Sequence, residues 1–368
     1  MTTTQEPTPA AVDALDESRR DALAERLFAG MLSGLELLAV ELGRRLDLYA
    51  ILHEQGTVDT LGLASAAGIA PRYAREWLEQ QAVAGVLDVV ADDDDADRRR
   101  YALPAASAAV VLDPDSPAYL GGASMALLGV ALTLEKVVDA FRSGGGVAYR
   151  DFGDNIRDGI AMLNRPVYRN DLAQWLETLP DVQERLSRGG AVLDVGCGSG
   201  WSTIELARAL PQATITGIDM DEASIAAARR NAVEAGVDVT FEVGDAAGLT
   251  TAQRVDLVTF FEALHDLGEP VQALARARAC LTPGGAVLVA DERVAPAFTA
   301  PGDELERLNY AYSVLHCLPA TMDESTAVAN GTVLREPTVR AWAAEAGYRR
   351  VDVLPIDNDL WRFYRLWP

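Results

Sequence analysis

The chain is poor in cysteine and has no long apolar run. It contains only 3 cysteines among 368 residues, Cys197, Cys280 and Cys317. These thiols are too few and too scattered for a disulfide framework or a zinc knot, so we expect reduced cysteines in a cytoplasmic protein. The N-terminal segment lacks a basic start followed by an apolar core, so no secretory signal is expected. Residues 124–141 form the most apolar stretch, but Glu135 and Lys136 interrupt it before the roughly 20 residues of a membrane span.

Basic residues are also scarce relative to acidic ones. The chain has 32 lysines and arginines against 55 aspartates and glutamates, which gives a formal net charge of −23. Such a surface repels phosphate backbones and anionic lipids over most of its area. Neither a nucleic acid nor a membrane is therefore an expected partner.

Hydrophobic residues make up 49% of the chain, which is enough for one large core or two smaller ones. After a tail expected to be disordered, at residues 1–21, helical spacing runs from residue 22 to 55 and stops at Gly56. A short helix, a third helix starting at Pro71 and a β-hairpin follow. Three helices and a hairpin predict a winged-helix domain over residues 22–105.

A winged helix can insert its third helix into a major groove while the hairpin contacts phosphates, so DNA binding is one interpretation. The third helix here offers only Arg72 and Arg75 as bases, and the hairpin tip carries four acids, Asp92 to Asp95. Carboxylates would then face the DNA backbone. We therefore expect a dimerisation module, followed by a helical linker or lid at residues 106–190.

Strand and helix patterns alternate from residue 191 onward. Five apolar strand segments are separated by helical stretches, which predicts a parallel sheet covered on both faces. Two further strand segments at the C-terminus lie too close together for a crossover helix, so they should pair antiparallel. The segments are AVLDVG, ATITGIDMD, VTFEVGDA, VDLVTFFEAL, AVLVADE, RRVDVLPI and DLWRFYRLWP. They predict a Rossmann-like α/β domain over residues 191–368.

A turn with three glycines follows the first of these strands. Gly196, Gly198 and Gly200 occur at alternate positions, unlike the G-x-G-x-x-G spacing that holds a pyrophosphate. Asp194 precedes the turn and suits a ligand with a positive amino group. Asp219 ends the second strand, where a carboxylate can accept from both ribose hydroxyls.

Asp245 ends the third strand and could accept from an exocyclic adenine amine. Acids at the ends of three consecutive strands therefore indicate a ligand that combines an amino-acid group with a nucleoside, that is, an aminoacyl nucleoside. Each residue also has a structural interpretation: Gly200 could serve packing, Asp194 could cap the turn, and Met220 could belong to the core. The order of these motifs along the chain favours the interpretation that they bind a ligand.

The motifs LDVGCGSG, GIDMD, GDAAGL, DLVTFFEALHDL and LTPGG resemble, in order, those of class I S-adenosylmethionine-dependent methyltransferases. The resemblance covers about residues 165–368. The N-terminal part is similar to the winged-helix dimerisation domain of bacterial small-molecule O-methyltransferases. The resemblance implies a seven-stranded sheet whose last strand is antiparallel, and S-adenosylmethionine as cofactor. It assigns the glycines to the methionine part of the cofactor, Asp219 to the ribose, and Asp245, Met220 and Ala246 to the adenine.

The catalytic chemistry is expected just past the fourth strand, because open α/β sheets bind ligands at that edge. Phe261, Glu262, His265 and Asp266 lie there, with Phe261 expected against the cofactor. His265 is the candidate general base, because an imidazole titrates near neutrality, and Glu262 and Asp266 would tune it. A histidine held by backbone hydrogen bonds at a helix start is the alternative.

The predicted site also includes residues that come before the first strand and after the fifth strand in the sequence. His316 and Tyr312 lie in a helical insertion after the fifth strand, where this family usually contacts its substrate. His265 and His316 could be part of a metal site, but no metal is expected because no i, i+4 pair supports one. Arg165 and Tyr168 precede the first strand and could close over the cofactor; a solvated helix face is the alternative.

The sequence thus predicts a methyltransferase that acts on a small molecule, a natural product or metabolite, most simply at oxygen. Two other enzyme interpretations remain open. One is carbon methylation, assisted by a metal on His265 and His316, and the other is a fold that keeps the cofactor without transferring its methyl group. A winged-helix regulator that senses a ligand is the alternative from another class. A homodimer formed through the N-terminal domain is expected.

Overall fold

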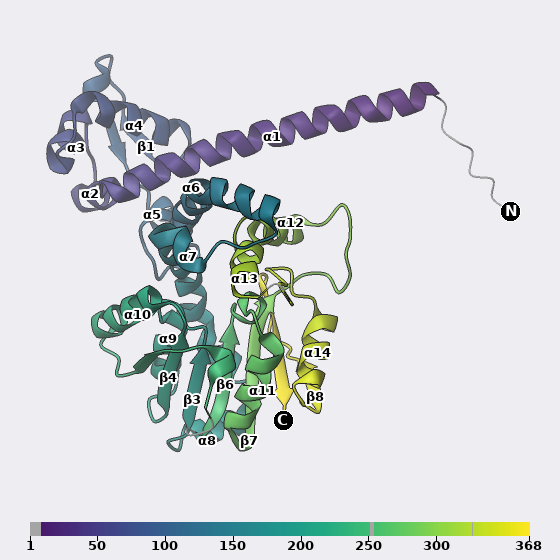
Figure 1. The fold of residues 1–368 in the computed structure, drawn as a ribbon. Helices are drawn as coiled ribbons and strands as arrows, with labels where there is room; N and C mark the ends of the chain where they lie inside the picture. The colour runs from purple at the N-terminus through teal and green to yellow at the C-terminus, as the bar shows by residue number, and fades with distance from the viewer. Residues whose placement is uncertain (1–8, 251–253, 326) are drawn as a thin grey trace. The chain divides into compact units, whose positions relative to one another are not determined.

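The computed structural model describes residues 9–250, 254–325 and 327–368. The chain divides into two compact units, Met1–Leu112 and Asp113–Pro368. Figure 1 shows the helices and strands of both units. Among the described residues, the structure has no helix with the length and hydropathy needed to cross a membrane.

The first unit is a helical domain with a small β-hairpin. Its elements are α1 (Pro9–Arg45), α2 (Leu48–Gln55), α3 (Thr60–Ala67), α4 (Pro71–Val83), β1 (Asp88–Ala91), β2 (Arg100–Ala102) and α5 (Ala105–Val111). β1 and β2 pair antiparallel, which confirms the predicted winged-helix pattern. The core contains Leu52, Leu63, Leu78 and Tyr101, all fully buried.

The N-terminal segment differs from the expectation of a disordered tail at residues 1–21. Helix α1 begins at Pro9, because residues 10–21 are rich in alanine and contain neither glycine nor a further proline. Residues 1–8 lie outside the described part of the chain. The helical spacing at residues 22–55 belongs to two helices, separated at Asp47, whose φ of 54° is left-handed.

The bases of the third helix of the winged domain, α4, are paired with acids. Arg72 forms an ion pair with Glu76 one turn later, and Arg75 lies 3.6 Å from Asp97 in the hairpin. At the hairpin tip, Arg99 contacts Asp92 at 2.8 Å. These pairs leave little positive potential on the face that would meet DNA.

The second unit starts with helices α6 (Gly121–Ser143), α7 (Tyr149–Leu176) and α8 (Pro180–Leu186). α6 and α7 pack closely because glycines lie at their contact. A Cβ atom at Gly122 would lie 2.5 Å from the carbonyl oxygen of Gly159, and one at Gly159 would lie 2.7 Å from the backbone nitrogen of Ala126. The helices of the predicted linker from Gly121 on are therefore part of the same compact unit as the sheet.

The sheet of the second unit has seven strands in the order β5-β4-β3-β6-β7-β9-β8. The strands are β3 (Ala191–Val195), β4 (Thr214–Asp219), β5 (Thr240–Val243), β6 (Val255–Phe261), β7 (Leu281–Glu292), β8 (Arg350–Val353) and β9 (Trp361–Trp367). The first five pair in parallel, whereas β9 runs antiparallel to both β7 and β8. The predicted α/β fold with an antiparallel last strand is thereby confirmed.

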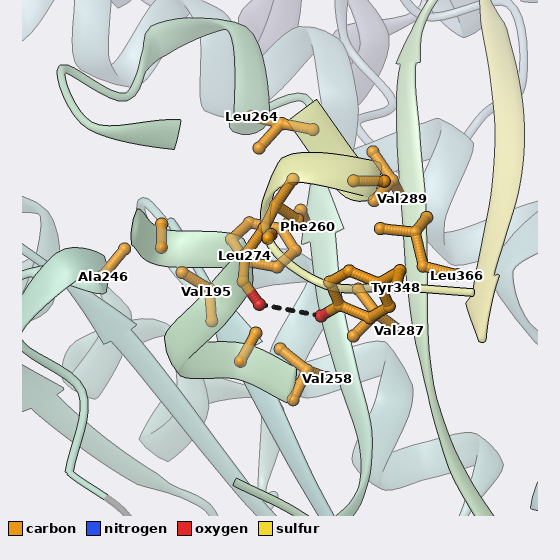
Figure 2. Packing of buried hydrophobic residues seen from close by; sticks show 14 of the residues in the cluster. Val195, Ala246, Val258, Phe260, Leu264, Leu274, Val287, Val289, Tyr348 and Leu366 are labelled. Atoms are coloured by element: carbon orange, nitrogen blue, oxygen red, sulfur yellow. Dashed lines mark hydrogen bonds between the residues drawn. The ribbon is translucent and has the colours of Figure 1, made fainter. Parts of the chain in front are cut away.

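Side chains of the strands alternate between two hydrophobic clusters, one on each face of the sheet. On β6, Val258 and Phe260 belong to the cluster covered by α11 (Pro270–Cys280) and α14 (Glu336–Glu345). Leu257 and Phe261 belong to the cluster on the opposite face, with residues of α7, α8 and α9 (Trp201–Ala209). Within the first cluster, the hydroxyl of Tyr348 donates to the carbonyl of Leu274 at 2.9 Å, as the dashed line in Figure 2 marks.

The remaining helices are α10 (Glu222–Ala235), α12 (Glu304–Tyr312) and α13 (Leu318–Glu324). A π-helical turn, Ser313–Cys317, joins α12 to α13. A 3₁₀ turn, Leu264–Asp266, follows β6. Both turns carry residues that the sequence singles out, because His265 lies in one and His316 in the other.

Candidate active site

The glycine turn lies directly after β3 and requires left-handed backbone. Gly196, Gly198 and Gly200 have φ angles of 70°, 51° and 83°. A Cβ atom at Gly198 would have no neighbour within 4 Å, which means that the backbone there borders open space. A Cβ atom at Gly200 would lie 2.6 Å from the ring of Phe241, so this glycine serves helix-to-sheet packing.

Asp194 is buried beneath the turn. Its carboxylate accepts hydrogen bonds from the hydroxyls of Ser202 at 2.6 Å, Thr203 at 2.7 Å and Thr259 at 2.7 Å. These bonds tie β3, α9 and β6 together. Burial raises the pKa of Asp194, while the three hydroxyl donors act in the opposite direction.

Asp219 ends β4 beside the turn. One carboxylate oxygen accepts from the backbone nitrogen of Gly198 at 2.8 Å, and the other accepts from Asp221 at 2.9 Å. Burial raises the pKa of Asp219 to about 6. The backbone bonds hold the carboxylate in place, and each oxygen keeps a lone pair for a further donor.

A cavity of about 510 Å³ opens at the carboxyl ends of β3, β4, β5 and β6. This volume lies within the usual range for a small-molecule site. Ten of the predicted site residues line it: Gly196, Gly198, Asp219, Met220, Asp245, Ala246, Phe261, Glu262, Asp266 and Tyr168. Strands and turns far apart in the chain thus contribute to one site.

The other predicted site residues are absent from the cavity lining, which consists of residues within the described ranges. Asp194 lies beneath the turn, and Gly200, at the end of the turn, faces the ring of Phe241. Arg165 stacks 4.0 Å from the ring centroid of Trp201 and pairs with Asp115 at 2.7 Å. His265, His316 and Tyr312 complete the set outside the lining.

Helix α7 supplies lining residues that the sequence analysis did not single out. Tyr149, Arg157, Asn164 and the predicted Tyr168 line the cavity from one side, together with Ile160 and Ala161. From Arg157 on, these positions recur every three or four residues, which is the period of one helix face. This spacing is visible in the sequence and indicates that the residues share one face of a helix. It does not indicate which part of the protein that face packs against.

Glu262 lies at the end of β6, facing the cavity. Its φ of 52° is left-handed, which is uncommon for a residue with a side chain and marks a backbone held by its surroundings. Its backbone nitrogen donates to the carbonyl of Ala290 at 2.8 Å, and its carboxylate accepts from the amide of Asn164.

A second buried acid lies next to Glu262, at the end of β7. Burial and the neighbouring Glu262 together raise the pKa of Glu292 well above its usual value. Burial also raises the pKa of Glu262. Two close carboxyl groups away from water favour sharing one proton.

His265 is only 2% exposed and lies in the 3₁₀ turn after β6. Its Nδ1 is 3.0 Å from Oδ1 of Asp291, and its Nε2 is 3.3 Å from Oδ1 of Asp266. Burial by itself lowers the pKa of His265, but the two aspartates outweigh it and raise the pKa well above the usual value. Of this group, Asp266 lines the cavity.

The arrangement fits an aminoacyl nucleoside. The open backbone at Gly198 allows close approach, Asp219 has acceptor capacity left for hydroxyls, and Asp245 accepts from the amide of Ala247 at 2.9 Å at the far end. Met220 and Ala246 add apolar surface between them. S-adenosylmethionine has this combination of hydroxyls, amines and an aromatic base.

Two protein families match separate parts of the chain. A family described as "Methyltransferase domain" matches residues 186–340, and a family described as "Rv2258c-like winged HTH domain" matches residues 34–112. Ubiquinone biosynthesis O-methyltransferase of Pseudomonas putida is 30% identical over 189 residues, which is 50% of this chain and 76% of that protein. The enzyme of the same name from Pseudomonas syringae pv. tomato is 30% identical over 192 residues, with the same two coverages.

Solved structures share the fold over almost the whole chain. Mitomycin 7-O-methyltransferase superposes with a TM-score of 0.64 at 20% identity and covers 95% of this chain and 99% of its own. Human N-acetylserotonin methyltransferase, solved in complex with S-adenosylmethionine, has a TM-score of 0.65 at 16% identity, with 100% and 99% covered. From the motifs, the sheet and these relatives together, the chain belongs to the class I S-adenosylmethionine-dependent methyltransferases.

Proposed function

We propose that this enzyme transfers a methyl group from S-adenosylmethionine to an oxygen atom of a small molecule bound in the cavity. One observation carries the proposal: the polar lining residues fall into two groups along the sheet edge. Asp245, Asp219 and Gly198 follow the neighbouring strands β5, β4 and β3, whereas Glu262, bonded to Asn164, ends β6. The first group suits the cofactor, and the second is left for an acceptor.

The choice of oxygen is supported by the relatives. The matching enzymes from both Pseudomonas species are O-methyltransferases by name, and so is the mitomycin enzyme. Besides the acids assigned to the cofactor, Glu262, Asp266 and Glu324 line the cavity. Carboxyl groups can accept from an acceptor hydroxyl and would repel an anionic acceptor.

The chain's own residues supply binding, alignment and a place for the proton. When bound, the cofactor supplies a methyl group activated by a sulfonium. Holding two reactants in line can supply on the order of 7 to 11 kcal/mol of the barrier reduction, so positioning by the cavity walls is the main contribution we expect. Tyr168 and Phe261, whose ring centroids are 5.8 Å apart, form the apolar part of those walls.

We propose that Glu262 accepts the proton that the acceptor hydroxyl loses during methyl transfer. This carboxyl group lines the cavity, and burial raises its pKa, which makes it a better proton acceptor than an exposed glutamate. Asn164 orients it through a hydrogen bond. The sequence-based prediction that His265 is the base remains a prediction, and Asp266 would have to connect that ring to the cavity.

Asp219→Ala is expected to weaken cofactor binding by roughly 1.5 to 3 kcal/mol, or about 10- to 150-fold in Kd, because hydrogen bonds to a charged group are lost. Titration calorimetry with the demethylated cofactor measures this effect. Asp219→Asn keeps the side-chain shape and separates lost charge from lost packing. Asp238→Ala, an exposed acid outside the cavity, is the matched control. Unchanged affinity in Asp219→Ala would remove this residue from the site.

We also propose that the chain forms a homodimer through α1. This 37-residue helix exposes a row of apolar side chains over most of its length. The row consists of Leu23, Leu27, Phe28, Met31, Leu32, Leu35, Leu38 and Leu42, which are between 40% and 65% exposed. A contiguous apolar surface of this length is typical of an interface between subunits.

The double variant Leu27→Glu/Leu35→Glu is expected to raise the dimer dissociation constant at least about 100-fold, because each buried leucine contributes about 1.5–3 kcal/mol. Light scattering should give twice the chain mass of 39.4 kDa for the unmodified protein and the single mass for the variant. The control Ala29→Glu/Ser33→Glu adds the same charge at exposed positions on the opposite face of α1 and should stay dimeric. A monomeric unmodified protein at micromolar concentration would argue against the proposal.

A cytoplasmic location is part of the same proposal. Cys197, Cys280 and Cys317 are all buried and unpaired, which suits a reducing compartment.

A further inference from the structure

Three side chains with metal-ligating atoms meet next to the cavity, and one of them, Asp266, lines it. They are His265 and Asp266 from the 3₁₀ turn after β6, and Cys317 from the π-helical turn. One ligand atom from each lies within 4.8 Å of the others. His265 and Cys317 are buried, and Asp266 is partly exposed toward the cavity.

The histidine of this group is held as metal-binding histidines usually are. Asp291 is fully buried, and its Oδ1 lies 3.0 Å from Nδ1 of His265. Its Oδ2 accepts from the backbone nitrogen of His265 at 3.3 Å. A carboxylate on one ring nitrogen fixes the tautomer and directs the other nitrogen, here Nε2, at the ligand position.

We propose that His265 Nε2, the Asp266 carboxylate and Cys317 Sγ form a binding site for one divalent transition metal, with zinc the best match to this mixed donor set. Nitrogen, oxygen and sulfur ligands at about 2.0 to 2.3 Å from a tetrahedral zinc lie about 3.3 to 3.7 Å from one another. The separation between His265 Nε2 and Asp266 Oδ1 is 3.3 Å.

A second imidazole stands beside the three ligands. His316 is 1% exposed, and its Nδ1 lies 3.4 Å from Cys317 Sγ. Its Nε2 is buried without a hydrogen-bond partner in the described structure. His316 is not one of the three mutually close ligands, so a tetrahedral metal on His265, Asp266 and Cys317 keeps a fourth position for water or an acceptor oxygen.

The charge around the cluster also favours a cation. Asp266, Asp291, Glu262 and Glu292 gather at this end of β6 and β7, and among the described residues none of them forms an ion pair with a lysine or arginine. In the described part of the chain, His265 is the one base in contact with them, so the acids of this group outnumber the positive charge available to balance them. A divalent ion would balance two of these charges at the point where Asp266 meets the cavity.

The site goes beyond the proposed methyl transfer and concerns the acceptor side only. Asp266 is both a proposed ligand and a lining residue, so the open position of the metal would be available to an acceptor that carries a hydroxyl or an adjacent pair of oxygens. Its class of ligand is therefore an oxygen-rich, neutral acceptor. Cofactor binding through Asp219 does not depend on it.

Cobalt(II) replaces zinc and reports on its ligands, so it is the probe. The full-length protein is freed of metal with a chelator, dialysed and titrated with Co²⁺. We expect one equivalent to bind, with a thiolate-to-cobalt charge-transfer band in the near ultraviolet. Cys317→Ser should lose that band. Cys280→Ser, a buried thiol whose Sγ donates to the carbonyl of Thr250 at 3.3 Å, should keep it.

A second variant, which changes a residue that positions His265 and is not itself a ligand, tests the proposal even if a ligand variant does not fold. Asp291→Asn leaves all proposed ligands in place and should weaken Co²⁺ binding about 10- to 100-fold while keeping the charge-transfer band. A band that persists in Cys317→Ser, or an unmodified protein that takes up no Co²⁺, overturns the proposal. Calorimetry of cofactor binding by the same metal-free protein tests the methyltransferase function separately.

Discussion

Glu262→Gln is expected to slow the chemical step of methyl transfer by about 10² to 10⁴-fold, the usual contribution of a positioned base. Glutamine keeps the size of the side chain and can still contact Asn164, but it cannot take a proton. Cofactor affinity should change little, because the carboxylate proposed to hold the ribose is Asp219, at the end of β4 rather than β6. Single-turnover kinetics would measure this, with an acceptor found by screening hydroxylated small molecules for release of the demethylated cofactor.

The pH dependence tests the same assignment. A general base works in its deprotonated form, and burial raises the pKa of Glu262, so the rate should fall as pH decreases through that raised pKa. In Glu262→Gln, this decrease of the rate at low pH (the acidic limb of the pH–rate profile) should disappear. Glu242→Gln changes an exposed residue on β5 and is the control; it should keep the rate and the acidic limb of the unmodified protein. A full rate in Glu262→Gln would exclude this carboxyl group as the proton acceptor.

His265→Ala tests the sequence-based alternative: if this ring is the base, the chemical step slows about 10² to 10⁴-fold, again with nearly unchanged cofactor affinity. The ring holds Asp266 at 3.3 Å and is itself held by Asp291 at 3.0 Å, so its removal leaves two acids without their partner. Calorimetry and single-turnover rates on one preparation separate binding from chemistry. A variant that transfers methyl at the original rate would show that His265 has no part in the reaction.

The two variants together decide which group accepts the proton. If Glu262 is the base, His265→Ala keeps the acidic limb of the rate profile and Glu262→Gln loses it. If His265 is the base, as the sequence alone predicts, the two results are reversed. Thermal unfolding of both variants should be followed in parallel, since an unfolded protein would imitate a loss of rate.

Local patterns along the chain predict much of the fold and the cofactor side of the site. The apolar periods of β3, β4, β5 and β6 identify a parallel sheet, and the carboxyl ends of parallel strands must meet at one edge. Asp219 and Asp245 come at two such ends, so their arrival at one cavity follows from strand order. The left-handed backbone at Gly198 likewise follows from the spacing of the glycine turn.

The acceptor side was much less predictable. His265 follows β6 as expected, but the 3₁₀ turn buries its ring between Asp266 and Asp291, and Asp291 comes from a different strand. Glu292 and Cys317 carried no local signal that would pair them with Glu262 or His265. The lining face of α7 is visible as a helical period, but the period does not tell which surface it covers.

By itself, then, the sequence determined the winged-helix pattern, the parallel sheet with its antiparallel C-terminal pair, and the acids at the ends of β4 and β5. Each of these depends on residues within one element or on the direction of neighbouring strands. The tertiary structure decided the environment of Glu262, His265 and Cys317. Their partners come from β7, α7 and the π-helical turn, and their contacts depend on how these elements pack. Burial and charge at that meeting point set the pKa values, and no local pattern encodes them.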